Sequence, residues 1–177
     1  AKLGDREFMD ARTSFKWIHD SFGSNFRMAE LEASMARVAL RELPAAHARR
    51  TELAHRLAAG LMDVHGIRVP LPGPESAHAF YRLYAHVEPG ELAPGWDRDR
   101  ILFAVAAEGT PVQYGSCAEL YREQAFIGAG LGLAERLPGA ARAHETSLAF
   151  FVHPTLSDAD IDDVVAAVRK VMAVAAE

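Results

Sequence analysis

The hydrophobic period of this chain changes at Ile67, and this change restricts the possible folds more than any other feature. Before Ile67, apolar residues recur at steps of three and four, which is the spacing of one face of a helix. After it, shorter apolar runs are separated by Pro, Gly and Asp, a pattern typical of strands and short helices joined by turns. The sequence therefore predicts an α+β fold.

The N-terminal part contains two helical stripes on either side of Pro44. A proline ends the helix that precedes it and is tolerated in the first turn of the next one. We therefore expect an antiparallel helical hairpin over residues 25–66, preceded by an arm or loop over residues 1–24. The two stripes consist of Met28, Leu31, Met35 and Val38, and then of Leu53, Leu57, Leu61 and Val64.

Residues 67–177 are expected to form a small α+β domain. Asp97 and Ser157 can cap its two main helices, because their side chains accept hydrogen bonds from backbone N–H groups of the first turn. We expect a small, largely antiparallel three-stranded sheet covered by these helices. The three substantial strand-forming runs are residues 78–87, 111–114 and 146–152, and residues 67–69 form an additional short one. Ala79, Tyr81, Leu83, Ala85 and Val87 lie on one side of the run 78–87.

Composition argues against several classes of function. The net charge of −5 and the absence of a basic stripe disfavour nucleic-acid binding. No apolar run approaches the ~20 residues that a membrane-spanning helix needs. The histidines do not occur in pairs with metal-ligand spacing, so no metal site is predicted. The single cysteine, Cys117, excludes an internal disulfide and suits a reducing compartment.

The residue pattern by itself shows no complete set of catalytic groups. Cys117 follows a predicted strand, where functional residues often lie, and His153 is the candidate base for a nucleophilic thiol. The preferred interpretation of Cys117 is a small buried hydrophobic residue.

One segment resembles a known family. Residues 22–33, Phe22-Gly23-Ser24-Asn25-Phe26-Arg27-Met28-Ala29-Glu30-Leu31-Glu32-Ala33, are similar to the G-x-N-[FY]-R-M-x-E-x-Q-A-A segment of the DegT/StrS family of sugar-nucleotide aminotransferases. Glu32 and Ser34 replace the usual glutamine and second alanine. Further segments match in the family's order: Arg49-Arg50, His78-Ala79-Phe80-Tyr81, Trp96-Asp97-Arg98-Asp99, Gly115-Ser116-Cys117-Ala118-Glu119-Leu120-Tyr121, and the stretch from Glu145 to Leu156.

This resemblance implies a fold-type I enzyme that uses pyridoxal 5'-phosphate (PLP). In such enzymes a large α/β domain holds the cofactor and a C-terminal small domain closes over it. The reaction transfers an amino group, usually from glutamate, to a nucleotide-linked keto sugar, with PLP as the electron sink. The resemblance also implies a cytoplasmic homodimer.

The resemblance assigns site residues by position. The asparagine of the family segment reaches the PLP phosphate of the neighbouring subunit, and this role falls to Asn25, with a plain helix cap as the alternative. Arg27 is expected to pair with a phosphate or carboxylate of the substrate, or to brace the helix through an ion pair. Tyr114, Ser116 and His153 lie where strand ends can face the substrate, although a structural role is preferred for each.

The family's Schiff-base lysine lies upstream of the asparagine segment, and none of Lys2, Lys16 and Lys170 has a matching context. The resemblance therefore implies the C-terminal part of such an enzyme, mainly its small domain, without a catalytic residue and inactive alone. Residues 1–24 would be an arm left from the large domain, and residues 25–66 would link the two domains. The alternative is a free-standing small domain that binds a separate chain carrying the PLP domain.

Overall fold

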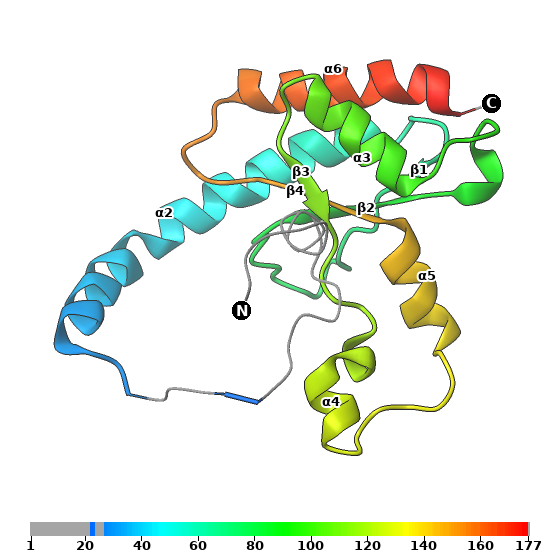
Figure 1. Cartoon of the computed structure of the whole chain (residues 1–177). Coiled ribbons are helices and arrows are strands. Elements are labelled where there is room, and N and C mark those ends of the chain that lie inside the picture. Colours follow the sequence, from blue (N-terminus) through cyan, green and yellow to red (C-terminus); the bar gives the residue numbers. More distant parts are fainter. Residues whose placement is uncertain (1–21, 24–26, 177) are drawn as a thin grey trace.

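The computed structural model describes residues 22–23 and 27–176, which form an α+β fold (Figure 1). The predicted fold class, with a small antiparallel sheet and covering helices, is confirmed. The elements in chain order are α2 (Glu30–Leu61), β1 (Ile67–Arg68), β2 (Leu83–Val87), the 3-10 helix η1 (Pro89–Glu91), α3 (Arg98–Ala107), β3 (Val112–Tyr114), the 3-10 helix η2 (Leu120–Arg122), α4 (Gln124–Gly128), α5 (Pro138–Thr146), β4 (Ser147–Phe150) and α6 (Asp158–Ala175).

The sheet has the strand order β1-β2-β4-β3, and every neighbouring pair is antiparallel. It contains four strands rather than the predicted three, because the short run Ile67–Arg68 pairs with the end of β2. The apolar run that contains β4 forms a central strand, as predicted. Its Phe150 lies opposite Leu83 on one side and Val112 on the other, so these three side chains share one face of the sheet.

That face is covered by α3, α6 and the C-terminal half of α2 (Figure 1), which share one apolar core with the strands. Leu53, Leu57 and Leu61 of α2 are fully buried, as are Ile161 and Val168 of α6. The helix starts are fixed as predicted. The Asp97 carboxylate accepts a hydrogen bond from Arg100 N at 2.7 Å, and the Ser157 hydroxyl accepts one from Asp160 N at 3.2 Å.

The prediction of a helical hairpin is wrong, because α2 is one continuous helix of 32 residues with Pro44 inside it. Proline removes one backbone hydrogen bond, but it does not by itself supply the left-handed or extended residues that a chain reversal needs. The flanking segments, Leu40 to Leu43 and Ala45 to Ala48, consist mainly of Leu, Ala, Glu and Arg, which are strong helix formers. The helix therefore continues through the proline.

The second predicted strand is shorter than expected, because its alternation breaks at Phe80. Phe80 has a positive φ of 43° and is buried, whereas the next residue, Tyr81, is 73% exposed. The Phe80 ring lies edge-on to the rings of His55 on α2 and His78. These contacts hold Phe80 in the core, and Tyr81 is turned to the outer side instead of the core side that the alternation predicted.

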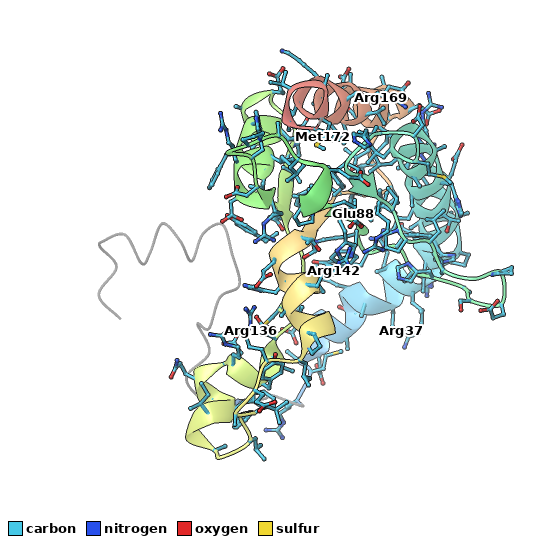
Figure 2. All side chains as sticks on the ribbon, turned by 90° about the vertical axis from the view of Figure 1, so that its right-hand side faces the viewer. Arg37, Glu88, Arg136, Arg142, Arg169 and Met172 are labelled. Carbon is cyan, nitrogen blue, oxygen red and sulfur yellow. The ribbon has the colours of Figure 1, made fainter. Side chains whose placement is uncertain are left out.

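The helix α5 lies beside the opposite end of β2, where Arg142 pairs with Glu88 at 2.5 Å (Figure 2).

Among the described residues, no helix has both the length and the apolar content required to cross a membrane.

Candidate functional site

The second face of the sheet carries the candidate site. Tyr84, Ala149 and Gln113 lie directly opposite one another across β2, β4 and β3. They alternate with the core residues, so they point away from the covering helices. Arg82 precedes Tyr84 by two residues and Phe151 follows Ala149 by two, which places both on this same side at one end of the row.

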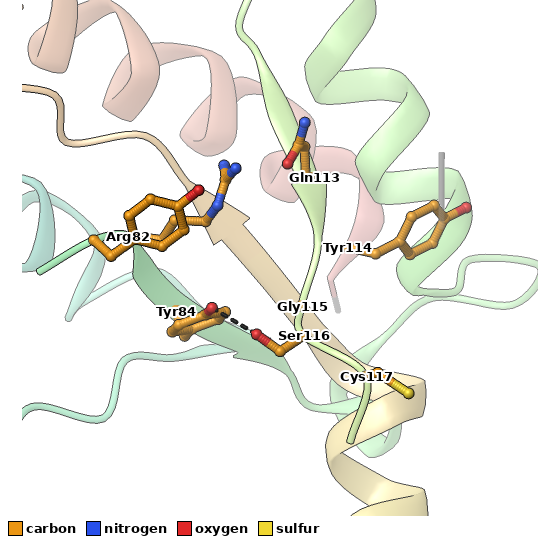
Figure 3. A pocket seen from close by; sticks show the side chains of 8 residues that line it. Arg82, Tyr84, Gln113, Tyr114, Gly115, Ser116 and Cys117 are labelled. Atoms are coloured by element: carbon orange, nitrogen blue, oxygen red, sulfur yellow. Dashed lines mark hydrogen bonds between the residues drawn. The ribbon is translucent and has the colours of Figure 1, made fainter. Parts of the chain in front are cut away.

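A cavity of ≈ 290 Å³ opens on this face (Figure 3). Figure 3 shows Arg82 and Tyr84 on one side of it and the end of β3 with Gly115 and Ser116 on the other. The two sides are joined by a hydrogen bond of 2.7 Å between the hydroxyl groups of Tyr84 and Ser116. The lining residues are Tyr81, Arg82, Tyr84, Gln113, Tyr114, Gly115, Ser116 and Cys117.

A smaller cavity of ≈ 170 Å³ shares Tyr81 and Arg82 with the first. Its other lining residues are Arg50, Phe151, Val152 and His153. The His153 ring is oriented by Thr155, whose hydroxyl lies 2.8 Å from His153 Nδ1. Tyr81 and Arg82 therefore form part of the wall of both cavities.

Arg82 is held by aromatic rings instead of hydrogen bonds. Its guanidinium carbon lies 4.2 Å from the ring centroid of Phe151 and 5.2 Å from that of Tyr81. Its Nη1 is buried and has no hydrogen-bond partner among the described residues. An unsatisfied buried donor of this kind costs about 1–3 kcal/mol or more when charged, so the site is suited to a ligand that accepts hydrogen bonds.

The structure brings together three of the five site residues predicted from sequence. Ser116 and Tyr114 line the larger cavity, and His153 lines the smaller one. Arg27 lies just before α2, is exposed, and lines neither cavity. Asn25 lies outside the described residues, and the residue at the N-cap of α2 is Ala29.

Tyr114 is mainly a core residue. Figure 3 shows its ring projecting away from Arg82 and Tyr84. The ring lies under the guanidinium of Arg98, with 4.4 Å between the guanidinium carbon and the ring centroid. Arg98 itself is buried and donates to the backbone oxygens of His144 and Ser147, each at 3.0 Å. This arrangement supports the structural role preferred for Tyr114.

Cys117 lies at the edge of the larger cavity, but its environment is wrong for a nucleophile. Its thiol donates to Glu123 Oε1 at 3.2 Å. Burial, together with the hydrogen bond to Glu123, raises the pKa of the thiol to about 11. Because the thiolate is the reactive form, the raised pKa disfavours a nucleophilic role for Cys117, although the residue is half-buried and not fully buried as expected.

The segment that follows Cys117 is fixed by a buried ion pair. Glu119 is fully buried, and its two carboxylate oxygens accept hydrogen bonds from Arg136 at 2.8 and 2.6 Å. The hydroxyl of Tyr121 donates a third at 2.8 Å. These contacts tie residues 119–136 together below the strand end that carries Ser116.

Arg82, Tyr84 and Gln113 are site residues that the sequence analysis missed. Polar residues on alternate positions of a strand normally face water, so the pattern gives no reason to single them out. The signal is the missing partner of Arg82 Nη1, which exists only in three dimensions.

Two expectations from the sequence, for a catalytic lysine and for a metal site, can be compared with the described part of the chain. Lys170 is the one lysine there; it is 70% exposed on α6 and pairs with Glu108 at 2.6 Å. No group of three or more His, Cys, Asp and Glu side chains is arranged to hold a metal ion within residues 22–23 and 27–176.

Comparison with known proteins shows which family this chain resembles. An aminotransferase from Psychrobacter cryohalolentis has a similar structure, with a TM-score of 0.76 and 36% sequence identity, over 90% of this chain and 42% of that one. The spore coat polysaccharide biosynthesis protein SpsC of Bacillus subtilis is 27% identical over 88% of this chain and 40% of its own length. The erythromycin biosynthesis protein EryC1 of Saccharopolyspora erythraea is 38% identical over 41% of this chain and 20% of its own length.

The chain thus spans about two fifths or less of the length of these relatives. The model of the DegT/DnrJ/EryC1/StrS aminotransferase family matches residues 6–169, which is most of the chain. The chain therefore belongs to the DegT/DnrJ/EryC1/StrS aminotransferase family.

Proposed function

We propose that this chain acts as the C-terminal part of a PLP-dependent aminotransferase that transfers an amino group from glutamate to a nucleotide-linked keto sugar. The family match over residues 6–169 carries this proposal. Residues 67–177 would be the small domain, residues 25–66 the link to the large domain, and residues 1–24 an arm of the large domain. The enzyme would be a cytoplasmic homodimer that makes amino sugars for polysaccharides or glycosylated products.

We propose that the described residues form one edge of the cofactor site and that the rest of this site lies in the part of the enzyme that this chain does not span. PLP supplies an electron sink that stabilises negative charge on the carbon that loses a proton. Among the described residues the one lysine is Lys170, which lies on α6, pairs with Glu108 and lines neither cavity, while Lys2 and Lys16 lie outside the described residues. We therefore assign the covalent anchor to the part of the relatives that this chain does not span. Asn25 is our candidate donor to the cofactor phosphate of a neighbouring subunit.

The chain's own contribution would be a wall that closes over the substrate. The linked hydroxyl groups of Tyr84 and Ser116 offer donors and acceptors to sugar hydroxyls. His153, oriented by Thr155, borders the smaller cavity and could contact the same ligand. Arg27 would act at the start of α2, either on a substrate anion or in bracing the helix. Together these groups would orient the ligand and exclude water from it.

A paired activity assay tests the proposal. The full-length gene product, supplied with PLP, L-glutamate and a keto sugar nucleotide, should release 2-oxoglutarate in step with the aminated sugar. The 177-residue chain, folded and given the same mixture, should release none, because we assign the Schiff-base lysine to the other part. Transamination by the chain alone would contradict the proposed division of roles. A full-length product that aminates none of a panel of keto sugar nucleotides would contradict the proposed reaction.

A further inference from the structure

Arg82 is the described side chain whose environment is least complete. Arg98 is a useful comparison, because it too places its guanidinium over a ring. Arg98 donates to Asp99 and to two backbone oxygens, whereas Arg82 Nη1 is buried without any partner in the described part of the chain. If the side chain at position 82 only filled space between two rings, an apolar side chain would serve as well as a charged one. The missing acceptor is therefore the feature to explain.

The surroundings of Arg82 select for negative charge. None of the described residues that line the two cavities is acidic, although the chain has a net charge of −5. Arg50 and His153 add basic groups to the smaller cavity, and Tyr84, Ser116 and Gln113 add neutral hydrogen-bonding groups to the larger one. An anion at Arg82 would thus meet donors on both sides and no carboxylate.

The geometry also favours an oxyanion over a halide. Phe151 and Tyr81 contact the guanidinium through their rings and so restrict its orientation, while Nη1 has no acceptor among the described residues. A guanidinium held in this way can offer two parallel N–H groups to the two oxygens of a carboxylate or phosphate.

We propose that Arg82 binds an oxyanion of the enzyme's small-molecule substrate in one of the two cavities that it lines. The identity of that substrate rests on the proposed function. The oxyanion is then a carboxylate of the amino donor or a phosphate of the sugar nucleotide, which present the same acceptor chemistry to Arg82.

Titration calorimetry of the 177-residue chain with L-glutamate and, separately, with uridine diphosphate tests this proposal. At constant ionic strength, we expect one of the two probes to bind with a Kd of about 1 mM, a reasonable value for a single charged subsite. The probe that binds identifies the source of the oxyanion. Arg82→Met should weaken binding at least tenfold, and Arg82→Lys should retain part of it. No saturable binding of either probe would overturn the proposal.

Arg100→Met is the matched control. The Arg100 guanidinium also lies over a ring, at 4.3 Å from Trp96, but its Nη1 donates to Gly95 O at 2.9 Å and it lines neither cavity. This variant should bind the probe as the unchanged chain does. An equal loss in Arg100→Met and Arg82→Met would mean that nonspecific charge causes the binding, which would also overturn the proposal.

Thermal unfolding separates a binding role from a structural one. If Arg82 waits for an anion, Arg82→Met removes an unsatisfied buried donor, so the Tm without ligand should stay unchanged or rise by about 2–4 °C. The proposal would be overturned by two results together. One is a clearly lower Tm, or failure to fold, of Arg82→Met, and the other is unchanged probe binding by Arg82→Lys. These results would assign Arg82 to packing. None of these measurements involves PLP or turnover, so their failure is distinct from failure of the proposed reaction.

Discussion

Glu119 remains ionised inside the protein because its neighbours replace the water that it loses. Arg136 donates two hydrogen bonds to it and Tyr121 one, and Arg122 lies at 3.7 Å. The Arg136 hydrogen bond is the main cause that lowers the pKa of Glu119 to about 2. This cluster fixes the chain next to the strand end that carries Ser116, so a single carboxylate supports one edge of the larger cavity.

Removing a partner from this cluster should destabilise the fold. At pH 7, Arg136→Met should lower the free energy of unfolding clearly, because it leaves the buried carboxylate of Glu119 with fewer donors. Arg142→Met removes an exposed pair with Glu88 and should cost less than about 1 kcal/mol. Urea denaturation of the two variants measures the difference. Equal effects would mean that Glu119 does not depend on Arg136.

The same cluster predicts a pH dependence with a definite sign. The pKa of Glu119 is lower in the folded chain than its usual 4.5, so its contribution to stability is present above that value. It should be lost as the pH falls from about 4.5 toward 2, when the unfolded chain binds a proton that the folded chain does not. In Glu119→Gln, this part of the acid sensitivity should disappear from urea denaturation curves recorded across that range.

At the scale of elements, α2 has two halves with different environments. Its C-terminal half is buried against α6 and the sheet, while its N-terminal half extends away from them (Figure 1). Leu31, Met35 and Val38 of that half, with Met28 just before it, are each more than half exposed. Their spacing places them on one helix face. We assign this face to contact with the large domain of the proposed enzyme.

In the isolated chain, that face should cause self-association. The double variant Leu31→Glu, Met35→Lys should shift the chain toward monomer in light scattering after size-exclusion chromatography, at equal concentration. Arg37→Glu, an exposed substitution on the same helix, is the control and should leave the distribution unchanged. A monomeric unchanged chain would contradict the assignment of this face and would favour a free-standing module.

The elements whose signals are local could be predicted from sequence. The caps at Asp97 and Ser157 and the apolar run of β4 depend on neighbouring residues, and each was found where expected. Pro44 and Phe80 could not be assigned in this way. The helix passes through Pro44, and the backbone at Phe80 is set by rings that include His55, 25 positions away in the sequence.

The candidate site, too, could be predicted from sequence only in part. Ser116 and His153 were reached through family motifs, and the structure places both beside cavities. Arg82 was not found in this way, because its importance depends on the missing partner of one nitrogen atom and on the rings of Tyr81 and Phe151, which are far apart in the sequence. A buried donor without a partner has no pattern along the chain.

At the scale of the whole molecule, two surfaces of the described part of the chain are candidates for contact with the large domain. One is the apolar face of α2, and the other is the face of the sheet that carries the two cavities. In the proposed enzyme both would be completed by the large domain, which would bring the cofactor to the face that carries Arg82, Tyr84 and Ser116. The small domain would then contribute substrate contacts and closure, and the large domain the chemistry.

The size of the native gene product tests this account most directly. An immunoblot of source cells, with an antibody raised against this chain, should show a band well above the 19.3 kDa of the 177 residues. Such a band would be the complete aminotransferase that the account requires. A single band at 19.3 kDa would contradict it, because the small domain would then exist alone and act through a separate partner chain.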